Sequence, residues 1–252
     1  MSWKISLFAA LTHALVAFAT GKRGLGWPSD NFFDPDIFVS SQVTFLFNWG
    51  VENPPLNTEF PYWVTQWGSG GIEQLSNVVS TVNPPVLLTF NEPDNPGQAN
   101  ISPTEAANLW KQYIQPLAQP GRKLIAPAVT NGVAAGTGTS WLDEFFAACE
   151  GCHFDGVAGH WYGGWMDDFQ EFIESLKKYN KPIYLTEFGF SWDADASVDS
   201  FTEFLPLAMD YLDNEDAVVA YAFFGAFHSG TAKDMITAQG TLTAVGELYV
   251  SS

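Results

Sequence analysis

The hydrophobic positions along the chain form short apolar runs, and these are separated by stretches in which apolar residues recur at helical spacing. Several of the runs are apolar throughout, without the alternation of a half-exposed strand, and this is typical of parallel strands covered on both faces. The runs predict eight strands, at residues 23–27, 43–47, 60–64, 86–90, 123–126, 156–159, 183–186 and 218–223.

The stretches between the runs predict helices. Ser102, Pro103 and Glu105 form a helix start, with proline in the first turn and an acid at the capping-box position. Alternating strands and helices imply parallel pairing through right-handed crossovers. Eight such strands predict one α/β domain, a compact (β/α)8 TIM barrel over residues 20–252. The rival, an open doubly wound sheet, would carry a glycine-rich phosphate-binding turn that residues 24–28 do not form.

Polar and aromatic residues follow many of the predicted strands. In a TIM barrel the functional groups gather at the carboxyl ends of the strands. Aromatic rings there could stack on the apolar faces of sugars, although each ring alone could equally fill space beneath a loop. The candidate substrate-binding residues at these ends are Trp27, Asn48, Trp49, Asn91, His160, Trp161, Tyr162, Trp165, Trp192 and Phe224.

Two glutamates occupy equivalent places after different strands. The segment LLTFNEPDNPG runs from a buried strand into Glu92, and PIYLTEFGF repeats this construction at Glu187. An ionised carboxylate beside a buried strand is costly unless it is partnered or used. Two carboxylates at one barrel mouth suit cleavage of a glycosidic bond, in which one donates a proton and the other attacks carbon or activates water. Alternatively, each is an ordinary loop acid, and Glu92 sits in a turn.

The two roles need different surroundings. The acid needs burial or a nearby negative charge to keep its proton, and the other carboxylate needs donors that hold it ionised. Tyr162 or His160 could be such a donor, unless His160 only satisfies a buried carbonyl group. His228 is expected to be solvated. Asp167 and its neighbour are expected to begin a helix and not to bind calcium.

The first residues of the chain have the pattern of a targeting segment. Lys4 is followed by a mostly apolar stretch that ends in Ala17-Phe18-Ala19, the small-x-small form of a cleavage site. We expect residues 1–19 to be a secretory signal peptide, although a buried first helix would also explain the apolar stretch. The protein is then secreted, extracellular or associated with the cell wall. The pair Lys22-Arg23 is either a processing site or the start of the first strand.

Cys149 and Cys152 are the only cysteines, in a C-x-x-C pattern. In an oxidising compartment this spacing predicts a local structural disulfide. Zinc would need more ligands than these two and His153, and the neighbourhood of a thioredoxin-like site is missing. Asn100 lies in an Asn-Ile-Ser sequon and is a candidate glycosylation site, although Pro103 follows directly.

The chain is strongly acidic, with a formal net charge of -18. Removing residues 1–19 would delete Lys4 and no acid, which gives -18 - 1 = -19. Such a surface repels nucleic-acid phosphates and anionic lipid, so we expect neither kind of partner. The acidity says nothing more about function, and we expect a monomer.

Four motifs, in this order, resemble glycoside hydrolase family 128, the compact fungal and bacterial β-1,3-glucanases within clan A of retaining glycosidases. They are KRGLGW at residues 22–27, LTFNEPD at 88–94, GHWYG at 159–163 and YLTEFG at 184–189. Asn-Glu-Pro alone is shared across the clan, whereas the ordered set is specific. The run YAFFGAF extends the similarity to residue 227.

The resemblance implies roles for particular residues. Glu92 corresponds to the acid/base and Glu187 to the nucleophile of a two-step retaining mechanism. Asn91 corresponds to the residue that binds the sugar 2-hydroxyl, and Tyr162 to the group that hydrogen-bonds the nucleophile. The resemblance implies no metal and no organic cofactor.

One position departs from the family pattern. Many clan members carry a tryptophan at the end of strand eight, where this chain has Phe223 and Phe224. Sugar stacking there is expected to be weaker or moved to another ring. The expected function is a secreted endo-β-1,3-glucanase that binds β-1,3-glucan in a groove open at both ends. The alternatives are a hydrolase of β-1,4-glucan, β-1,6-glucan or mannan, and a glucan-binding barrel without activity.

Overall fold

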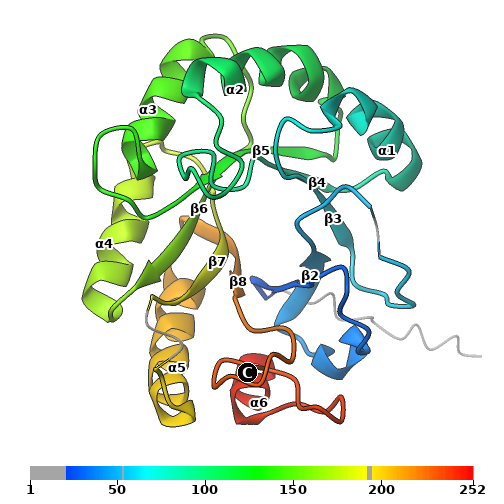
Figure 1. Cartoon of the computed structure of the whole chain (residues 1–252), viewed down its shortest axis with the longest axis vertical. Coiled ribbons are helices and arrows are strands. Elements are labelled where there is room, and N and C mark those ends of the chain that lie inside the picture. Colours follow the sequence, from blue (N-terminus) through cyan, green and yellow to red (C-terminus); the bar gives the residue numbers. More distant parts are fainter. Residues whose placement is uncertain (1–20, 53, 192–194, 252) are drawn as a thin grey trace, which may run out of the picture.

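The computed structural model describes residues 21–52, 54–191 and 195–251, which fold as a closed barrel of eight parallel strands in sequence order (Figure 1). The predicted signal peptide, residues 1–19, and Trp192 lie outside the described residues. The TIM-barrel prediction is confirmed. The strands are β1 (Arg23–Gly26), β2 (Val43–Phe47), β3 (Tyr62–Gln66), β4 (Val86–Thr89), β5 (Lys123–Val129), β6 (Gly156–Gly163), β7 (Ile183–Phe190) and β8 (Val218–Phe223).

Helices cover the outside of the strand ring (Figure 1). The crossover from β1 to β2 contains only the 3₁₀ turn η1 (Pro35–Phe38), and the described residues between β2 and β3 contain no helix. The outer layer is therefore thinnest over the first strands. The α-helices are α1 (Leu75–Val82), α2 (Pro103–Leu109), α3 (Gly138–Ala148), α4 (Met166–Lys177), α5 (Val198–Asn214) and α6 (Ala244–Val250). Shorter helical turns are η2 (Ile72–Gln74), η3 (Trp110–Ile114) and η4 (Gln115–Leu117).

The helices begin where the sequence signals predict. The Ser102 side chain accepts from the Glu105 backbone N–H at 3.3 Å, and α2 starts at Pro103. Asp168 accepts from two backbone N–H groups that precede α4, so this acid opens the helix as expected. The apolar stripe of α4 is buried against the barrel, at Phe169, Phe172, Ile173 and Leu176.

Aromatic side chains fill the lower barrel interior. Phe45 on β2 stacks on Trp63 of β3 with ring centroids 3.6 Å apart. Gly24 on β1 makes room for this pair, because a Cβ atom there would lie 2.1 Å from the Phe45 ring. The interior is thus a packed core, and a ligand can approach only from the mouth of the barrel.

A buried polar cluster closes the amino-terminal face of the barrel. The Arg23 guanidinium on β1 donates to Asp213 of α5 at 2.8 Å and to the Tyr221 hydroxyl of β8 at 2.9 Å. Lys22 donates to two backbone carbonyls at the carboxyl end of α5, where a cation is favoured. Of the two readings of the Lys22-Arg23 pair, the structure shows the pair entering the first strand.

Cys149 and Cys152 form the predicted disulfide just after α3. Asn100 is exposed, in the loop before α2, and its glycosylation stays a prediction. In the described part of the chain, no helix is both long enough and apolar enough to cross a membrane.

Candidate active site

The turn after β4 brings Glu92 to the barrel mouth. Phe90 and Glu92 have positive φ angles of 30° and 45°, a strained conformation for residues with side chains. Backbone hydrogen bonds on both sides hold this conformation, because Phe90 donates to Gln66 at 2.8 Å and Glu92 donates to Ala128 at 2.7 Å. The strain is therefore balanced by the pairing of the turn with both neighbouring strands.

Asp94 fixes the other end of this turn. Its buried carboxylate accepts from the Thr130 backbone N–H, from the Thr130 hydroxyl at 2.6 Å and from the Gly138 N–H at 2.7 Å. These bonds join the turn to the loop between β5 and α3. The Glu92 backbone thus lies between two anchored points.

A β-bulge aims the second glutamate. Gly159 pairs with Leu185, but the next residue of β6, His160, pairs with Glu187, so Thr186 is an extra residue on β7. Bulges of this kind re-aim side chains beside active sites. As a result Thr186 and Glu187 both reach His160, with Thr186 Oγ1 2.9 Å from Nε2 and Glu187 Oε1 3.6 Å from Nδ1.

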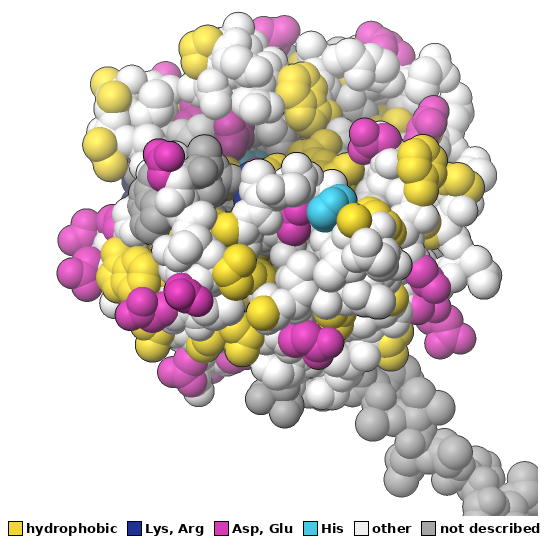
Figure 2. Space-filling view, turned by 60° about the horizontal axis from the view of Figure 1, so that its bottom comes forward, with side chains coloured by type: hydrophobic (Ala, Val, Ile, Leu, Met, Phe, Trp, Pro, Cys, Tyr) yellow, Lys and Arg dark blue, Asp and Glu magenta, His cyan; other side chains and the backbone are white. Residues whose placement is uncertain are grey.

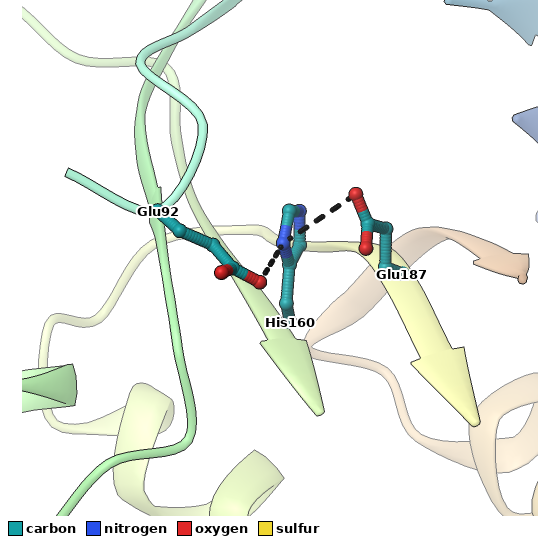
Figure 3. A group of neighbouring side chains, drawn as sticks. All are labelled: Glu92, His160 and Glu187. Carbon is teal, nitrogen blue, oxygen red and sulfur yellow. Dashed lines mark hydrogen bonds and ion pairs between the residues drawn. The ribbon is translucent and has the colours of Figure 1, made fainter. Parts of the chain in front are cut away.

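His160 stands between the two carboxylates, which point toward it from the turn after β4 and from β7 (Figure 3). His160 Nδ1 lies 3.0 Å from Glu92 Oε1. One ligand atom from each of the three residues lies within 4.8 Å of the others, and all three side chains are buried. The two glutamates therefore face one point.

Two donors hold the Glu187 carboxylate. Trp49 Nε1 donates to Oε1 at 2.6 Å, and the Tyr162 hydroxyl donates to Oε2 at 2.7 Å. The Phe224 ring packs edge-on against Trp49 and Tyr162, with centroids 5.7 and 5.9 Å away. This aromatic support fixes the donors, and the donors fix the position of the Glu187 carboxylate.

The charges in the cluster bias where a proton resides. Burial raises the pKa of Glu92, but hydrogen bonds from His160 and Asn95 and the His160 charge outweigh it, so this pKa lies below its ordinary value. Burial lowers the pKa of His160, but the charge of Glu187 and the bond to Glu92 outweigh it, so this pKa is raised. Both shifts favour the state in which His160 carries the proton between the two carboxylates.

Glu92, His160 and Glu187 are also residue types that bind transition metals, and their ligand atoms are close enough to share one ion. Coordination would use the lone pair of His160 Nδ1. This nitrogen is already paired with Glu92 Oε1 at 3.0 Å, so the arrangement favours acid–base chemistry over metal binding.

The barrel is closed directly beneath the glutamates. The cavity there, lined in part by Asn91, His160 and Thr186, has a volume of about 10 Å³, which holds no sugar. Asn91 is buried beside Glu92, and its side-chain amide donates to Gln98 at 3.3 Å. A substrate must therefore lie above the two carboxylates, at the open mouth.

Two predicted substrate contacts are wrong because the side chains point out of the barrel. Trp27 is fully buried behind β1, where its ring packs edge-on against Phe38 and its Nε1 donates to the Asn31 carbonyl. Trp161 is also fully buried, and it stacks on Phe204 of α5 at a centroid distance of 5.6 Å. Both rings belong to the layer between strands and helices.

Two further predicted contacts serve other purposes. Asn48 is buried and holds the loop after β2, since its side chain accepts from the Gly50 N–H and donates to the Glu52 carbonyl. Trp165 stacks on Phe190 outside the barrel, with one part of its ring exposed. The structure does not bring either residue to the glutamates.

Two supporting residues were not predicted. The Asn95 side chain donates to Glu92 Oε2 at 2.8 Å, and Thr186 contacts the distal nitrogen of His160. Asn95 follows Glu92 by three residues in a tight turn, and this spacing in the sequence could have predicted the contact. The contact of Thr186 depends on the bulge in β7, for which the sequence carries no signal that we recognise.

The fold and the carboxylate pair are those of a glycoside hydrolase barrel. Similarity to known proteins shows to which glycoside hydrolase family the chain belongs. The family model described as "Glycosyl hydrolase catalytic core" matches residues 24–249. The chain is 33% identical over 244 residues to alkali-sensitive linkage protein 1 of Schizosaccharomyces pombe, and the match covers 92% of this chain. It covers 45% of that protein, so the chain spans about half the length of this relative.

Solved structures give the same result. A family 128 (subgroup IV) endo-β-1,3-glucanase from Lentinula edodes is 29% identical, with a TM-score of 0.78 and coverage of 92% of this chain and 100% of that one. A subgroup III curdlan-specific exo-β-1,3-glucanase from Blastomyces gilchristii is 30% identical, with a TM-score of 0.76 and coverage of 93% and 100%. A subgroup VII oligosaccharide-binding protein from Cryptococcus neoformans is 26% identical, with a TM-score of 0.74 and coverage of 92% and 93%.

The chain therefore belongs to glycoside hydrolase family 128, and the resemblance of the four sequence motifs is confirmed.

Proposed function

We propose that this protein is an endo-β-1,3-glucanase that cleaves with retention of configuration. The observation that carries the proposal is the approach of Glu92 and Glu187, whose nearest oxygens lie within 4.8 Å. Carboxyl groups of retaining glycosidases are about 5–5.5 Å apart, whereas inverting enzymes leave roughly 6.5–9.5 Å for a water molecule. The short separation supports a nucleophilic role for one of the two.

The surroundings assign the two roles. Glu187, which accepts from Trp49 and Tyr162, attacks the anomeric carbon, and the bond to the leaving oxygen breaks as Glu92 protonates that oxygen. In the second step Glu92 takes a proton from water. The water oxygen bonds to the anomeric carbon, and Glu187 departs as a carboxylate. The two steps consume one water and return both glutamates to their initial state.

The proton that Glu92 delivers must first reach it. The raised pKa of His160 favours this residue as the holder of the proton in the free protein, and its Nδ1 lies 3.0 Å from Glu92 Oε1. Transfer along this hydrogen bond leaves neutral His160 beside protonated Glu92, with no change in the net charge of the cluster. A neutral sugar above the cluster excludes water, and the loss of solvation favours the neutral pair over the charged one.

The linkage and the cleavage mode rest on the relatives and on the mouth of the barrel. The Lentinula edodes and Blastomyces gilchristii proteins are described as acting on β-1,3-glucan. Only residues 164 and 165 separate β6 from α4, so this part of the mouth carries no long loop, which supports an open groove and internal cleavage. The second candidate is a glucan-binding barrel without activity, which the Cryptococcus neoformans relative favours. Both glutamates are present here, and their geometry favours the enzyme.

The test is release of reducing sugar from laminarin and curdlan by the wild-type protein and by Glu187→Gln and Glu92→Gln. We expect both variants to lose at least about 1000-fold in kcat, because each removes a group used in bond cleavage. Glu144→Gln, an exposed position on α3, is the matched control and should keep full activity. Undiminished turnover by Glu187→Gln would exclude the mechanism, and a wild type that binds glucan without releasing sugar would establish the second candidate.

The linkage and the mode of cleavage need their own measurements. Products from laminari-oligosaccharides of increasing length distinguish internal cleavage from release of terminal glucose. A panel of β-1,4-glucan, β-1,6-glucan and mannan tests the linkage. A preference for any of these over laminarin would contradict the β-1,3 assignment.

We also propose that the protein is secreted after removal of residues 1–19. The support is the apolar segment and its Ala-Phe-Ala end. Amino-terminal sequencing of protein recovered from the culture medium of the source organism should begin at Thr20. Recovery of intact Met1 from that medium would contradict the proposal.

A further inference from the structure

A second cavity of about 360 Å³ opens on the same face of the barrel as the glutamates. It is formed by the segments that follow β1 and β8, two strands that are neighbours in the barrel. Its walls carry three phenylalanines and three polar residues, namely Asp30, Asn31, Phe32, Phe33, Phe227 and His228. This cavity has no part in the mechanism above.

A row of aromatic rings joins this cavity to the catalytic cluster. The Phe227 ring lies 5.3 Å from Phe224, and Phe224 contacts both Trp49 and Tyr162, the two donors to Glu187. The aromatic row is therefore continuous from the nucleophile to the cavity, with Lys233 Nζ 5.1 and 5.8 Å from the ring centroids of Phe224 and Phe227. A chain of sugars that leaves the cluster in this direction would pass along these rings.

Hydrogen bonds fix the walls of the cavity. The Asn31 amide donates to the Ala226 carbonyl at 2.8 Å and so ties the segment after β1 to the segment after β8. His228 Nδ1 lies 3.1 Å from the Ile236 carbonyl and 3.2 Å from the buried Asp234 carboxylate. The cavity is thus held open by bonded loops, as a preorganised binding site requires.

The polar and apolar groups of the cavity suit a neutral sugar. Phe32 lies at the edge of the cavity and is 93% exposed. A ring in this position can stack on the apolar face of a pyranose. The Asp30 carboxylate and the His228 ring can bind equatorial hydroxyls. An anionic ligand is disfavoured by Asp30 and by the net charge of -18.

We propose that this cavity is an outlying subsite for the non-reducing part of the β-1,3-glucan chain. The inference rests on the proposed function and adds the direction in which the glucan chain lies across the barrel mouth. Glu92, in the turn after β4, must lie beside the departing oxygen, so the leaving part of the glucan chain is on its side. Glu187 on β7 holds the retained sugar, and β8 and β1 come next around the barrel, away from β4. The retained chain therefore extends over Phe224 toward Phe32.

The experiment measures binding without cleavage. In a Glu187→Gln background, calorimetry gives the dissociation constants of a long and a short laminari-oligosaccharide, and their ratio reports contacts that only the long chain makes. We expect Phe32→Ala to reduce the preference for the long chain by about 3- to 10-fold, the effect of one lost aromatic contact. Val39→Ala, an exposed apolar side chain in the same crossover but outside the cavity, is the matched control and should keep the ratio.

The outcomes separate this proposal from the proposed function. If wild type releases sugar and Phe32→Ala leaves the ratio unchanged, the subsite is overturned while the enzyme stands. If wild type releases no sugar but Phe32→Ala lowers the ratio, the subsite stands on a binding protein. Failure of the Glu187→Gln protein to bind the long chain better than the short one would also overturn the subsite. His228→Ala provides a second variant, and it should lower the same ratio.

Discussion

At the scale of single residues, His160 is the group that allows two carboxylates to lie so close together. Without it, two like charges within 4.8 Å would repel, and one of them would take up a proton. The imidazolium between them supplies that proton in a form shared with Glu92. The same contact stabilises the pair and stores the proton that catalysis uses.

We therefore expect His160→Gln to change the pH dependence of kcat/KM. In the wild type, activity is lost as the pH rises through the raised pKa of His160, because the shared proton then leaves. In the variant the proton can reside only on Glu92, a carboxyl group whose ordinary pKa is lower than that of histidine. The alkaline limb of the profile should move to lower pH. An unmoved limb would show that His160 does not hold the proton, and Thr186→Ser, which keeps the hydroxyl, is the control.

The donors to Glu187 make a second prediction at this scale. Trp49→Phe and Tyr162→Phe each remove one hydrogen bond to the carboxylate and keep an aromatic ring. Hydrogen bonds to charged groups contribute roughly 1.5–3 kcal/mol, so each variant should lose about 10- to 100-fold in kcat. Circular dichroism checks that the fold is retained. A loss below about threefold in both variants would show that the donors do not position the nucleophile.

At the scale of secondary-structure elements, the turn after β4 depends on Asp94. Asp94→Ala would leave the Thr130 and Gly138 donors buried without their acceptor. We expect a loss of about 3 kcal/mol in the free energy of unfolding, which lowers Tm by roughly 6–12 °C for a domain of this size. Activity should fall as well, because Glu92 lies in the same turn.

Thermal unfolding followed together with laminarin hydrolysis checks this expectation. Asp143→Ala is the control, since this acid is exposed on α3 and its partners, Lys178 and the Tyr179 hydroxyl, meet it at the surface, where a salt bridge contributes little. If Asp94→Ala unfolds at the wild-type temperature, the anchoring role is wrong.

The positions of the strands could be predicted from apolar runs, but the ends of β6 and β7 could not. The sequence prediction ends these strands at residues 159 and 186, and the structure extends them to Gly163 and Phe190. Polar residues such as His160 and Glu187 look like the end of a buried run. They remain in the strands because the barrel mouth supplies them with partners, and a one-dimensional pattern does not contain those partners.

The errors among the candidate site residues have a related cause. The sequence places Trp161 next to the site but does not by itself state which face it takes. Because side chains alternate along a strand, His160 and Tyr162 point inward and Trp161 points outward. This correction was available once β6 was known to continue through residue 163. The role of Asn48 depends on the path of the following loop, which no local pattern specifies.

At the scale of the whole molecule, one face of the barrel contributes to stability and the other carries the candidate active site. The amino-terminal face carries the Arg23 cluster that joins β1, α5 and β8, and the carboxyl-terminal face carries the glutamates and the aromatic row. TIM barrels commonly divide stability and chemistry in this way. The strained backbone at Phe90 and Glu92 lies at the carboxyl-terminal face. The barrel tolerates it there because the Arg23 cluster closes the amino-terminal face.

The charge of the whole molecule makes the last prediction. Acidic side chains are spread over the face shown in Figure 2, where basic ones are few, and the net charge is -18. A neutral glucan is neither attracted nor repelled by this field, so kcat/KM on laminarin should change by less than about twofold when salt is raised from low to physiological concentration. A carboxymethylated β-1,3-glucan is repelled at low salt, and its hydrolysis should increase as salt screens the repulsion. If both substrates respond alike, the field does not act on substrate approach, and the acidity would serve only the solubility of the protein.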